Sequence, residues 1–268
     1  MKDSSERPVL IDVSEGVATV TLNNPRAMNV LSEDMLAALQ ETWDEIGADR
    51  SIKVVILRGA GDHFCAGHNL KEMTARRTDP DGGKAYFNAL FQTCTKMMLS
   101  IVRLPQPVIA EVQGIATAAG CQLVATCDLA IAADDARFAT SGVNIGLFCS
   151  TPMVALSRNV TRKQAMEMLL LGEFLPAKRV LEMGLINKAV PKAELSQATR
   201  DMARIIADKA PVAIKIGKEA FYAQAEMTLE DAYAYAGAAM AENMMARDTT
   251  QGIDAFINKQ PMPPWEDK

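Results

Sequence analysis

The chain has 268 residues, of which 49% are apolar and 23% are charged, so it can bury the core of one large domain, or of one domain with an appendage. Its formal net charge of −5 gives no general electrostatic reason to bind nucleic acid or an anionic membrane. The start of the chain has no apolar signal core, and no run approaches the roughly 20 apolar residues of a membrane span. These features predict a cytoplasmic protein without nucleic-acid or membrane partners.

In the first half of the chain, strand and helix patterns alternate. Apolar alternation predicts strands at 9–13 and 17–22, joined by a short turn. Ser32 is placed as the N-cap of a helix with an apolar face, and a buried-type strand follows at 53–57. Helical spacing then recurs over 87–101 and ends at two prolines.

The same alternation continues through the middle of the chain. Strands at 108–112 and 129–133 enclose a short helix at 119–127. This repetition of strand, turn and helix predicts an α/β architecture in which helices cover the faces of a sheet. A capping-box pattern that begins at Thr161 introduces the next helix, and another short helical run follows at 176–183.

From about Leu195 onward the pattern is wholly helical. Thr228 can cap a long helix, and residues 249–257 can form the last one. Apolar residues, including several methionines, cover more of the long helix than a lone surface helix needs. We therefore divide the chain into a core at 1–192 and a helical region at 193–268.

Five cysteines form no CxxC pair and no recognisable metal-ligand spacing, and their odd number fits poorly with a disulfide framework. We expect buried, reduced thiols and no bound metal. Cys65 and Cys121 flank two glycine-containing turns, and a Cys–His–Asn nucleophile could be built through His68. We regard packing as the better explanation of these thiols.

The two turns are the segments 64–70 and 114–122. Each follows a strand pattern, turns through small residues and can open a helix whose free backbone N–H groups point at a bound acceptor. Two such turns that face one cleft could hold a carbonyl oxygen that becomes negative during a reaction. Taken singly, Gly67 and Gly120 are explained equally well by tight strand-to-helix turns.

Four segments together resemble the crotonase superfamily, which is the enoyl-CoA hydratase/isomerase family. They are Asn-Pro-Arg-Ala-Met-Asn-Val-Leu at 24–31, the segments 64–73 and 114–128, and Phe-Ile-Asn-Lys at 256–259. The amino-acid sequences of segments 114–122 and 142–152 are most similar to those of a divergent branch of that family. The resemblance implies a spiral of ββα units, an acyl-CoA partner, and a helical C-terminal region that packs subunits into a homotrimer or hexamer.

By this resemblance, the backbone N–H groups of His68 and Ala119 form an oxyanion hole for the enolate of a thioester. At the two positions where members of the family commonly have glutamates, this chain has Gln122 and Gly142. Gln122 can orient a water but cannot take its proton, and Gly142 is expected in a turn with positive φ. Acid–base assistance is typically worth about 10²–10⁴-fold, so we expect weak hydration, which restoring both acids should raise if the backbone accepts them.

Other groups are poor replacements for the two acids. Glu111 lies on a predicted strand where alternation leaves its direction open, and Asp128 follows a helix where it can hold structure. We assign the His68 imidazole a packing or hydrogen-bonding role, because no acid that would orient it is identifiable in the sequence.

The resemblance also implies contacts to coenzyme A, which enters as part of the substrate, so that no permanently bound cofactor is expected. Within one chain the expected contacts are Arg26, Ala66, Asn69, Leu70, Lys71 and Gly120. Arg26 and Lys71 are explained almost equally well as solvated surface residues. Met240 and Lys259 lie where a neighbouring subunit's CoA site could be completed.

Three functions of different classes stay open. The first is an enoyl-CoA hydratase-like lyase or isomerase, which the two turns favour and the missing acids oppose. The second is an acyl-CoA-binding protein with little catalysis. The third is a thioesterase or decarboxylase that uses the same oxyanion hole with other groups.

Overall fold

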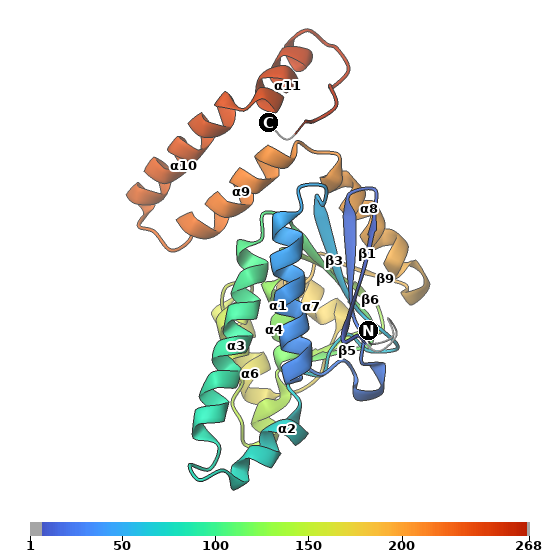
Figure 1. Ribbon diagram of the computed structural model, residues 1–268, viewed down its shortest axis with the longest axis vertical. Helices are drawn as coiled ribbons and strands as arrows, with labels where there is room; N and C mark the ends of the chain where they lie inside the picture. The colour runs from blue at the N-terminus through green and yellow to red at the C-terminus, as the bar shows by residue number, and fades with distance from the viewer. Residues whose placement is uncertain (1–6, 267–268) are drawn as a thin grey trace.

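The computed structural model describes residues 7–266 and contains a six-stranded sheet with the order β1-β2-β3-β4-β6-β9 (Figure 1). These strands are β1 (Val9–Ser14), β2 (Val17–Leu22), β3 (Val54–Gly59), β4 (Val108–Val112), β6 (Leu129–Ala133) and β9 (Lys188–Val190). β1 pairs with β2 in the antiparallel direction, and all the other neighbours are parallel.

A second sheet is built from short strands that follow the longer ones. It has the order β5-β7-β8, with β5 (Ile115–Thr117), β7 (Arg137–Ala139) and β8 (Leu175–Pro176). Isolated bridges between Leu31 and His68 and between Cys65 and Ala116 continue it toward the start of the chain. Each turn of the chain thus adds a strand to the first sheet, a short pairing to the second sheet, and a helix. This arrangement confirms the predicted spiral of ββα units.

Helices cover both faces of the large sheet. Those of the first 192 residues are α1 (Glu33–Ala48), α2 (Leu70–Ala75), α3 (Lys84–Arg103), α4 (Ala119–Thr126), α5 (Ser150–Leu156), α6 (Arg162–Leu171) and α7 (Ala177–Met183). The C-terminal helices are α8 (Leu195–Ala207), α9 (Pro211–Gln224), α10 (Leu229–Met245) and α11 (Arg247–Ile257). No helix between residues 7 and 266 combines the length and the apolar content that crossing a membrane requires.

Alternation along the parallel strands separates two sets of buried side chains. Val55 and Leu57 of β3 join the main core, which also contains Trp43 of α1 and Met97 of α3. The intervening residues of β3 pack instead with Ala203 and Ala207 of α8. Near-continuous apolar strands are typical of a parallel sheet buried on both faces.

Capping side chains define several helix starts as the sequence predicts. The Ser32 hydroxyl accepts a hydrogen bond from the Met35 N–H, and the Thr228 hydroxyl accepts one from the Asp231 N–H. Thr161 and Gln164 form the predicted capping box at α6. Strands of two or three residues, such as β5 and β8, carry too few residues to show a periodicity, so sequence reasoning missed them.

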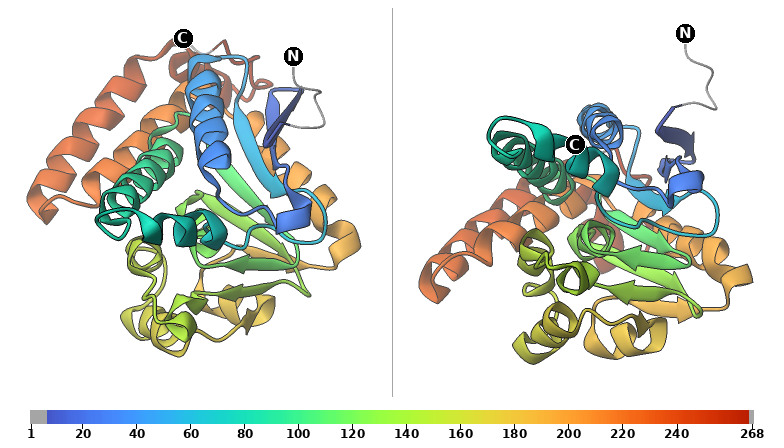
Figure 2. Two further views of the ribbon diagram at one scale, coloured as in Figure 1. Left: turned by 60° about the horizontal axis from the view of Figure 1, so that its bottom comes forward. Right: turned by 90° about the horizontal axis from the view of Figure 1, so that it is seen from below.

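The C-terminal helices α9 and α10 lie side by side and extend away from the sheet (Figures 1 and 2). A buried ion pair attaches α9 to the core, because Lys218 Nζ lies 2.7 Å from Asp128 Oδ2 and also donates to the carbonyl groups of Ile101 and Gln106. The Tyr222 hydroxyl donates to the other Asp128 oxygen. Asp128 therefore holds structure, as its position after a helix suggests.

Candidate functional site

The structure brings the two glycine-containing turns side by side. The Thr117 N–H donates to the Cys65 carbonyl at 3.0 Å, and the Cys65 N–H donates to the Ile115 carbonyl at 3.1 Å. The first turn is also held from its other side, since the Leu31 N–H donates to the Gly67 carbonyl at 2.7 Å. Both turns open helices as predicted, α2 after the first and α4 after the second.

Two glycines permit the close approach of these turns. Gly67 has a φ of +90°, and a Cβ added to it would lie 3.0 Å from Ala118 Cβ and 3.2 Å from the Ala119 nitrogen. A Cβ on Gly120 would overlap the carbonyl oxygen of Cys65. A side chain at Gly120 would therefore force the two backbones apart, whereas one at Gly67 would need smaller shifts and a positive φ that residues with a Cβ rarely adopt.

The backbone donors predicted for the oxyanion hole lie at this contact. Ala119 is the first residue of α4, where helix N–H groups have no partner within the helix. His68 follows Gly67 directly, and it forms an isolated parallel β-bridge with Leu31. Outside regular elements, the backbone hydrogen bonds of residues 7–266 include none donated by the N–H of His68 or of Ala119. Both donors are therefore available to a bound acceptor.

Ala118 holds the second turn in a strained backbone conformation. Its φ of 50° and ψ of −120° lie in a region that residues with a Cβ rarely adopt. Such outliers cost about 1–3 kcal/mol and persist where the surroundings enforce them. Here the Ala118 N–H donates to the Ala139 carbonyl at 3.0 Å, which fixes the turn against β7. The sequence did not reveal this strained position.

The His68 imidazole is buried near the turns and packs edge-on against Phe91 of α3, with ring centroids 5.6 Å apart. Neither ring nitrogen has a partner that meets hydrogen-bond distance and angle. Burial lowers the pKa of His68, against a smaller opposite effect from the backbone of Leu31. The ring is therefore neutral near pH 7, with one N–H donor and one acceptor nitrogen available.

Gln122 is buried in the first turn of α4, with 6% of its surface exposed. Its backbone N–H donates to the Ala118 carbonyl at 3.0 Å, whereas its side-chain oxygen has no hydrogen-bond partner. A buried acceptor without a partner costs about 1–3 kcal/mol. Together with His68, Gln122 thus contributes polar groups beside the turns that a ligand or a water can satisfy.

At Gly142 the predicted turn with positive φ is wrong. Gly142 is buried in the 3-10 helix Ser141–Ile145, and the positive φ of this loop occurs at Gly146. The constraint on Gly142 is space, because an added Cβ would overlap the Leu147 carbonyl oxygen and lie 2.9 Å from Cys149 Sγ. A glutamate at this position therefore needs a rearranged loop.

Several of the predicted CoA contacts of one chain lie together. The Ala66 N–H donates to the Met28 carbonyl at 3.0 Å, which joins the first turn to the loop that bears Arg26. Asn69 caps α2 by accepting a hydrogen bond from the Lys71 N–H. Arg26, Leu70 and Lys71 are exposed, whereas Gly120 is buried.

Met240 and Lys259 belong to a different part of the molecule. Met240 lies on α10 and is 72% exposed, and Lys259 follows α11. In Figure 1 these helices lie at the opposite end of the molecule from α2. Within one chain they do not join the turns, so their predicted role requires a neighbouring subunit.

The alternative nucleophiles and acids lie elsewhere or are inactivated by burial. All five cysteines are free and buried, and burial raises the pKa of Cys65 and of Cys121 to about 12. These thiols are protonated near neutral pH, which excludes a resting thiolate nucleophile. Glu111 contacts α8 rather than the turns, through Ser196. Between residues 7 and 266, no group of three or more His, Cys, Asp or Glu side chains is placed to hold a metal ion.

A hydroxyl pair beside the second turn was not found from the sequence. Thr117 Oγ1 and Ser141 Oγ are 2.9 Å apart and link the end of β5 to the loop that contains Gly142. The two residues are 24 positions apart, so only the pairing of β5 with β7 brings them together. Sequence spacing gives no signal for such a contact.

Comparison with known proteins identifies close relatives over nearly the whole chain. A family profile described as enoyl-CoA hydratase/isomerase matches residues 12–268. The chain is 44% identical over 264 residues to the mitochondrial enoyl-CoA hydratase domain-containing protein 3 of Homo sapiens, covering 98% of this chain and 85% of the relative. This match confirms the predicted similarity to a divergent branch.

Solved structures show the same fold. A crystal structure of an enoyl-CoA hydratase from Mycobacterium smegmatis superposes with a TM-score of 0.93 at 52% identity, covering 97% of this chain and 99% of the other. The human enoyl-CoA hydratase domain-containing protein 3 superposes with a TM-score of 0.88 at 44% identity, covering 97% and 100%.

We predict that His68 makes stability fall as the pH drops below about 6.5, the usual pKa of an unfolded-state histidine. The pKa of His68 is lowered in the folded state, so the unfolded chain binds the proton at a higher pH than the folded chain does. Acidification therefore stabilises the unfolded chain relative to the folded one. Urea unfolding midpoints measured between pH 7 and pH 5 should fall less steeply for His68→Phe than for the wild type. The control Phe91→Leu alters the same packing but keeps the imidazole, and it should retain the wild-type slope. Equal slopes for wild type and His68→Phe would contradict the prediction.

Proposed function

The chain belongs to the enoyl-CoA hydratase/isomerase family, and from that premise we propose that it binds acyl-CoA thioesters and stabilises their enolate with the backbone N–H groups of His68 and Ala119. The observation that supports this function is the packing of Gly67 against Ala118 and the Ala119 nitrogen. In this contact the first residue of α4 lies against Gly67, the residue that precedes His68. In enzymes, losing one donor of such a pair costs about 2.7–4 kcal/mol of transition-state stabilisation.

The side chains around the proposed oxyanion hole determine which reactions of the enolate are fast. Gln122 supplies an amide that can orient a water or the acyl group, but it cannot take a proton. His68 is neutral near pH 7 and has no carboxylate among its contacts to orient it. Hydration of a double bond needs both water activation and protonation of the enolate, so it should be slow.

Decarboxylation is a second candidate that the same observation favours. When a malonyl-type thioester loses carbon dioxide, the electron pair of the broken carbon–carbon bond moves into the thioester and forms the enolate directly. No base has to remove a proton in that step, so the absence of carboxylates at Gln122 and Gly142 is no obstacle to it. The enolate then takes one proton from water.

The first test of the proposed function is thioester binding by calorimetry. Butyryl-CoA should bind at least about tenfold more weakly to Gly67→Ala, since the new Cβ meets Ala118 and the Ala119 nitrogen and pushes the turns apart. Gly82→Ala is the matched control, because Gly82 also has a positive φ, +69°, but its Cβ would meet nothing within 4 Å. Unchanged affinity in Gly67→Ala would rule out a ligand site at this contact.

The second test concerns the reaction. Crotonyl-CoA hydration by the wild type should be slow, and Gln122→Glu should accelerate it at least about tenfold, because a carboxylate at this position can accept the proton of water. Gly142→Glu should add nothing, since its side chain overlaps the Leu147 carbonyl. Malonyl-CoA and methylmalonyl-CoA belong in the same assay, with products identified by mass. Rapid hydration by the wild type would show that another acid–base group operates.

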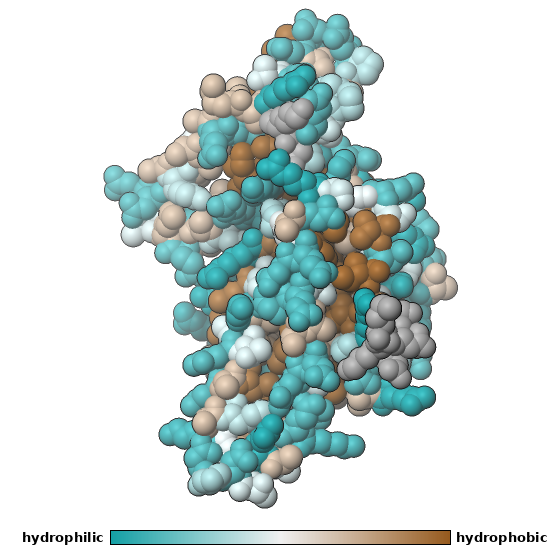
Figure 3. Space-filling view, viewed as in Figure 1, coloured by the Kyte–Doolittle hydropathy of each residue, from teal (hydrophilic) through white to brown (hydrophobic). Residues whose placement is uncertain are grey.

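We also propose that the chain assembles into a homotrimer or hexamer through its C-terminal helices. Apolar side chains on α10 and α11 are strongly exposed in a single chain, among them Leu229, Tyr233, Met240, Met245 and Phe256. In Figure 3 the surface over α10 contains many weakly apolar residues. The cytoplasmic location stays a prediction, and the human relative is mitochondrial by name.

Light scattering should therefore report a trimer or hexamer at micromolar concentration. Met240→Glu should shift the population toward monomers and weaken CoA binding, because the charge opposes burial of the α10 face. Ile205→Glu is the control, since Ile205 is an equally apolar exposed residue, 61% exposed, on α8. A monomeric wild type, or CoA affinity that does not follow assembly, would contradict this proposal.

A further inference from the structure

A row of polar side chains crosses the large sheet at the carboxyl ends of its strands. Thr21 of β2 is the cross-strand partner of Arg58 of β3, and Arg58 is the partner of Glu111 of β4. On the same face, the preceding layer is apolar, with Ile56 beside Ile109. The row therefore interrupts the apolar contact between the sheet and α8 at the edge where open parallel sheets commonly bind ligands.

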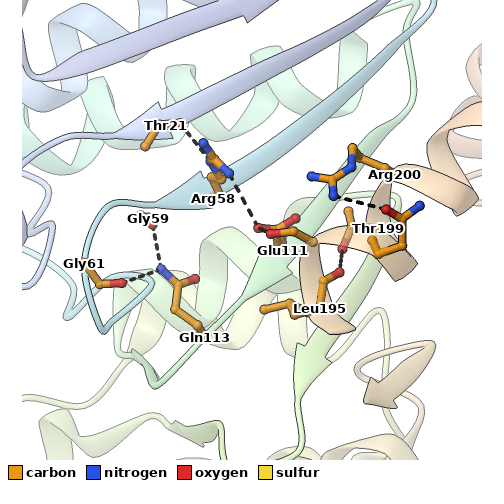
Figure 4. A network of polar contacts seen from close by, with 11 residues as sticks. Thr21, Arg58, Gly59, Gly61, Glu111, Gln113, Leu195, Thr199 and Arg200 are labelled. Carbon is orange, nitrogen blue, oxygen red and sulfur yellow. Dashed lines mark hydrogen bonds and ion pairs between the residues drawn. The ribbon is translucent and has the colours of Figure 1, made fainter. Parts of the chain in front are cut away.

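Figure 4 shows this row with its polar contacts. A cavity of about 370 Å³ lies over it. Its remaining walls include the loop after β3, Lys192, and Ser196 at the start of α8. None of the residues assigned to the oxyanion hole or to CoA lines it. The site is therefore separate from the one that the proposed function uses.

Glu111 contributes a buried carboxylate that is incompletely paired. Its side chain is 7% exposed, and Oε1 accepts one hydrogen bond from the Ser196 hydroxyl at 2.9 Å. The nearest cation is Arg58 Nη1 at 4.0 Å, too far for a hydrogen bond, and Arg58 Nε is engaged with Thr21 Oγ1. A buried carboxylate needs closer hydrogen-bonding partners than this to offset its desolvation.

Gln113 contributes a second acceptor. Its side-chain nitrogen donates to the carbonyl groups of Gly59 at 2.6 Å and Gly61 at 3.2 Å, which fixes the orientation of the amide. The side-chain oxygen is buried without a hydrogen-bond partner. In Figure 4 this oxygen lies on the side of Glu111 and Leu195. Two acceptors thus line the cavity: the charged one has a single neutral donor, Ser196, and the neutral one has none.

The two cationic side chains of the cavity, Arg58 and Lys192, lie closer to solvent than Glu111 does. The Arg58 side chain is 41% exposed, and Lys192 is 52% exposed and 3.9 Å from the exposed Asp62. A ligand that fits both zones carries donors at its inner end and a negative charge at its outer end. A phosphate or a simple anion does not fit the inner end, because it would face the Glu111 carboxylate.

We propose that this cavity binds a small ammonium carboxylate, such as an α-amino acid. The ammonium group donates to Glu111 and to the Gln113 side-chain oxygen, and the carboxylate pairs with the outer face of the Arg58 guanidinium. Charge-assisted hydrogen bonds of both signs then complete the pairing that the protein leaves open. The proposal does not depend on acyl-CoA chemistry.

The test is calorimetric titration of the full-length protein with glycine, L-alanine and L-serine. At least one of the three should bind saturably in the millimolar range or better. Propionate lacks the ammonium group, ethylamine lacks the carboxylate, and L-lactate replaces the ammonium with a hydroxyl. Each should bind at least tenfold more weakly than the tightest-binding of the three amino acids, because each leaves one end of the cavity unpaired.

Variants locate the binding. Glu111→Gln keeps an acceptor for Ser196 but removes the charge, and Arg58→Gln removes the outer cation, so each should weaken amino-acid binding at least tenfold. Glu167→Gln, which alters the surface ion pair with Arg179, is the matched control and should bind like the wild type. Arg58 is partly exposed, so its variant keeps the test informative where Glu111→Gln fails to fold. No saturable binding of the three amino acids, equal binding of L-lactate, or unchanged affinity in both variants would overturn the proposal.

Discussion

The rest of the candidate site depends on the close approach of two backbone segments, 65–67 and the start of α4. Gly67 lies against Ala118 and the Ala119 nitrogen, where a Cβ would be tightly crowded, and Gly120 lies against the Cys65 carbonyl, where there is no room for a Cβ. Short pairings of the second sheet hold the segments at this distance. Because the donors are backbone N–H groups, their position is set by the fold, while the side chains at 68 and 119 are free to differ.

Proton transfer, by contrast, would depend on side chains, and at Gly142 this chain has no side chain that could take part. At Gly142 the space for a longer side chain is filled by the Leu147 carbonyl and the Cys149 thiol. The Thr117–Ser141 hydroxyl pair anchors the same loop to β5. The loop is thus packed around a glycine, so a carboxylate side chain at this position would require the loop to rearrange. The contact between the two turns and the packing of the Gly142 loop are therefore separate features of this fold, because different residues hold them.

Sequence patterns predicted the parts of the fold that local rules determine. The five longer strands of the large sheet, the caps Ser32, Thr161 and Thr228, and the helices after both turns follow from periodicity and capping. The short strands β5, β7, β8 and β9 were missed because tertiary pairing defines them, and the positive φ of Ala118 was missed because it accompanies the hydrogen bond to Ala139. At Gly142 the sequence indicated a glycine-specific constraint but not its cause, which is a contact with residues five to seven positions away.

Alternate side chains of the parallel strands β3 and β4 lie in two different environments, the main core and the face covered by α8. This division limits which side chains of these strands can approach the two turns. Side chains that alternate along one strand point to opposite faces of the sheet. Leu57 and Ala110 fill the main core, whereas Arg58 and Glu111 face α8. An acid on this layer of the strands therefore either enters the apolar core or faces away from the oxyanion hole. The polar side chains that lie beside the turns come instead from the loops and helix starts beyond the strands, as those of His68 and Gln122 do.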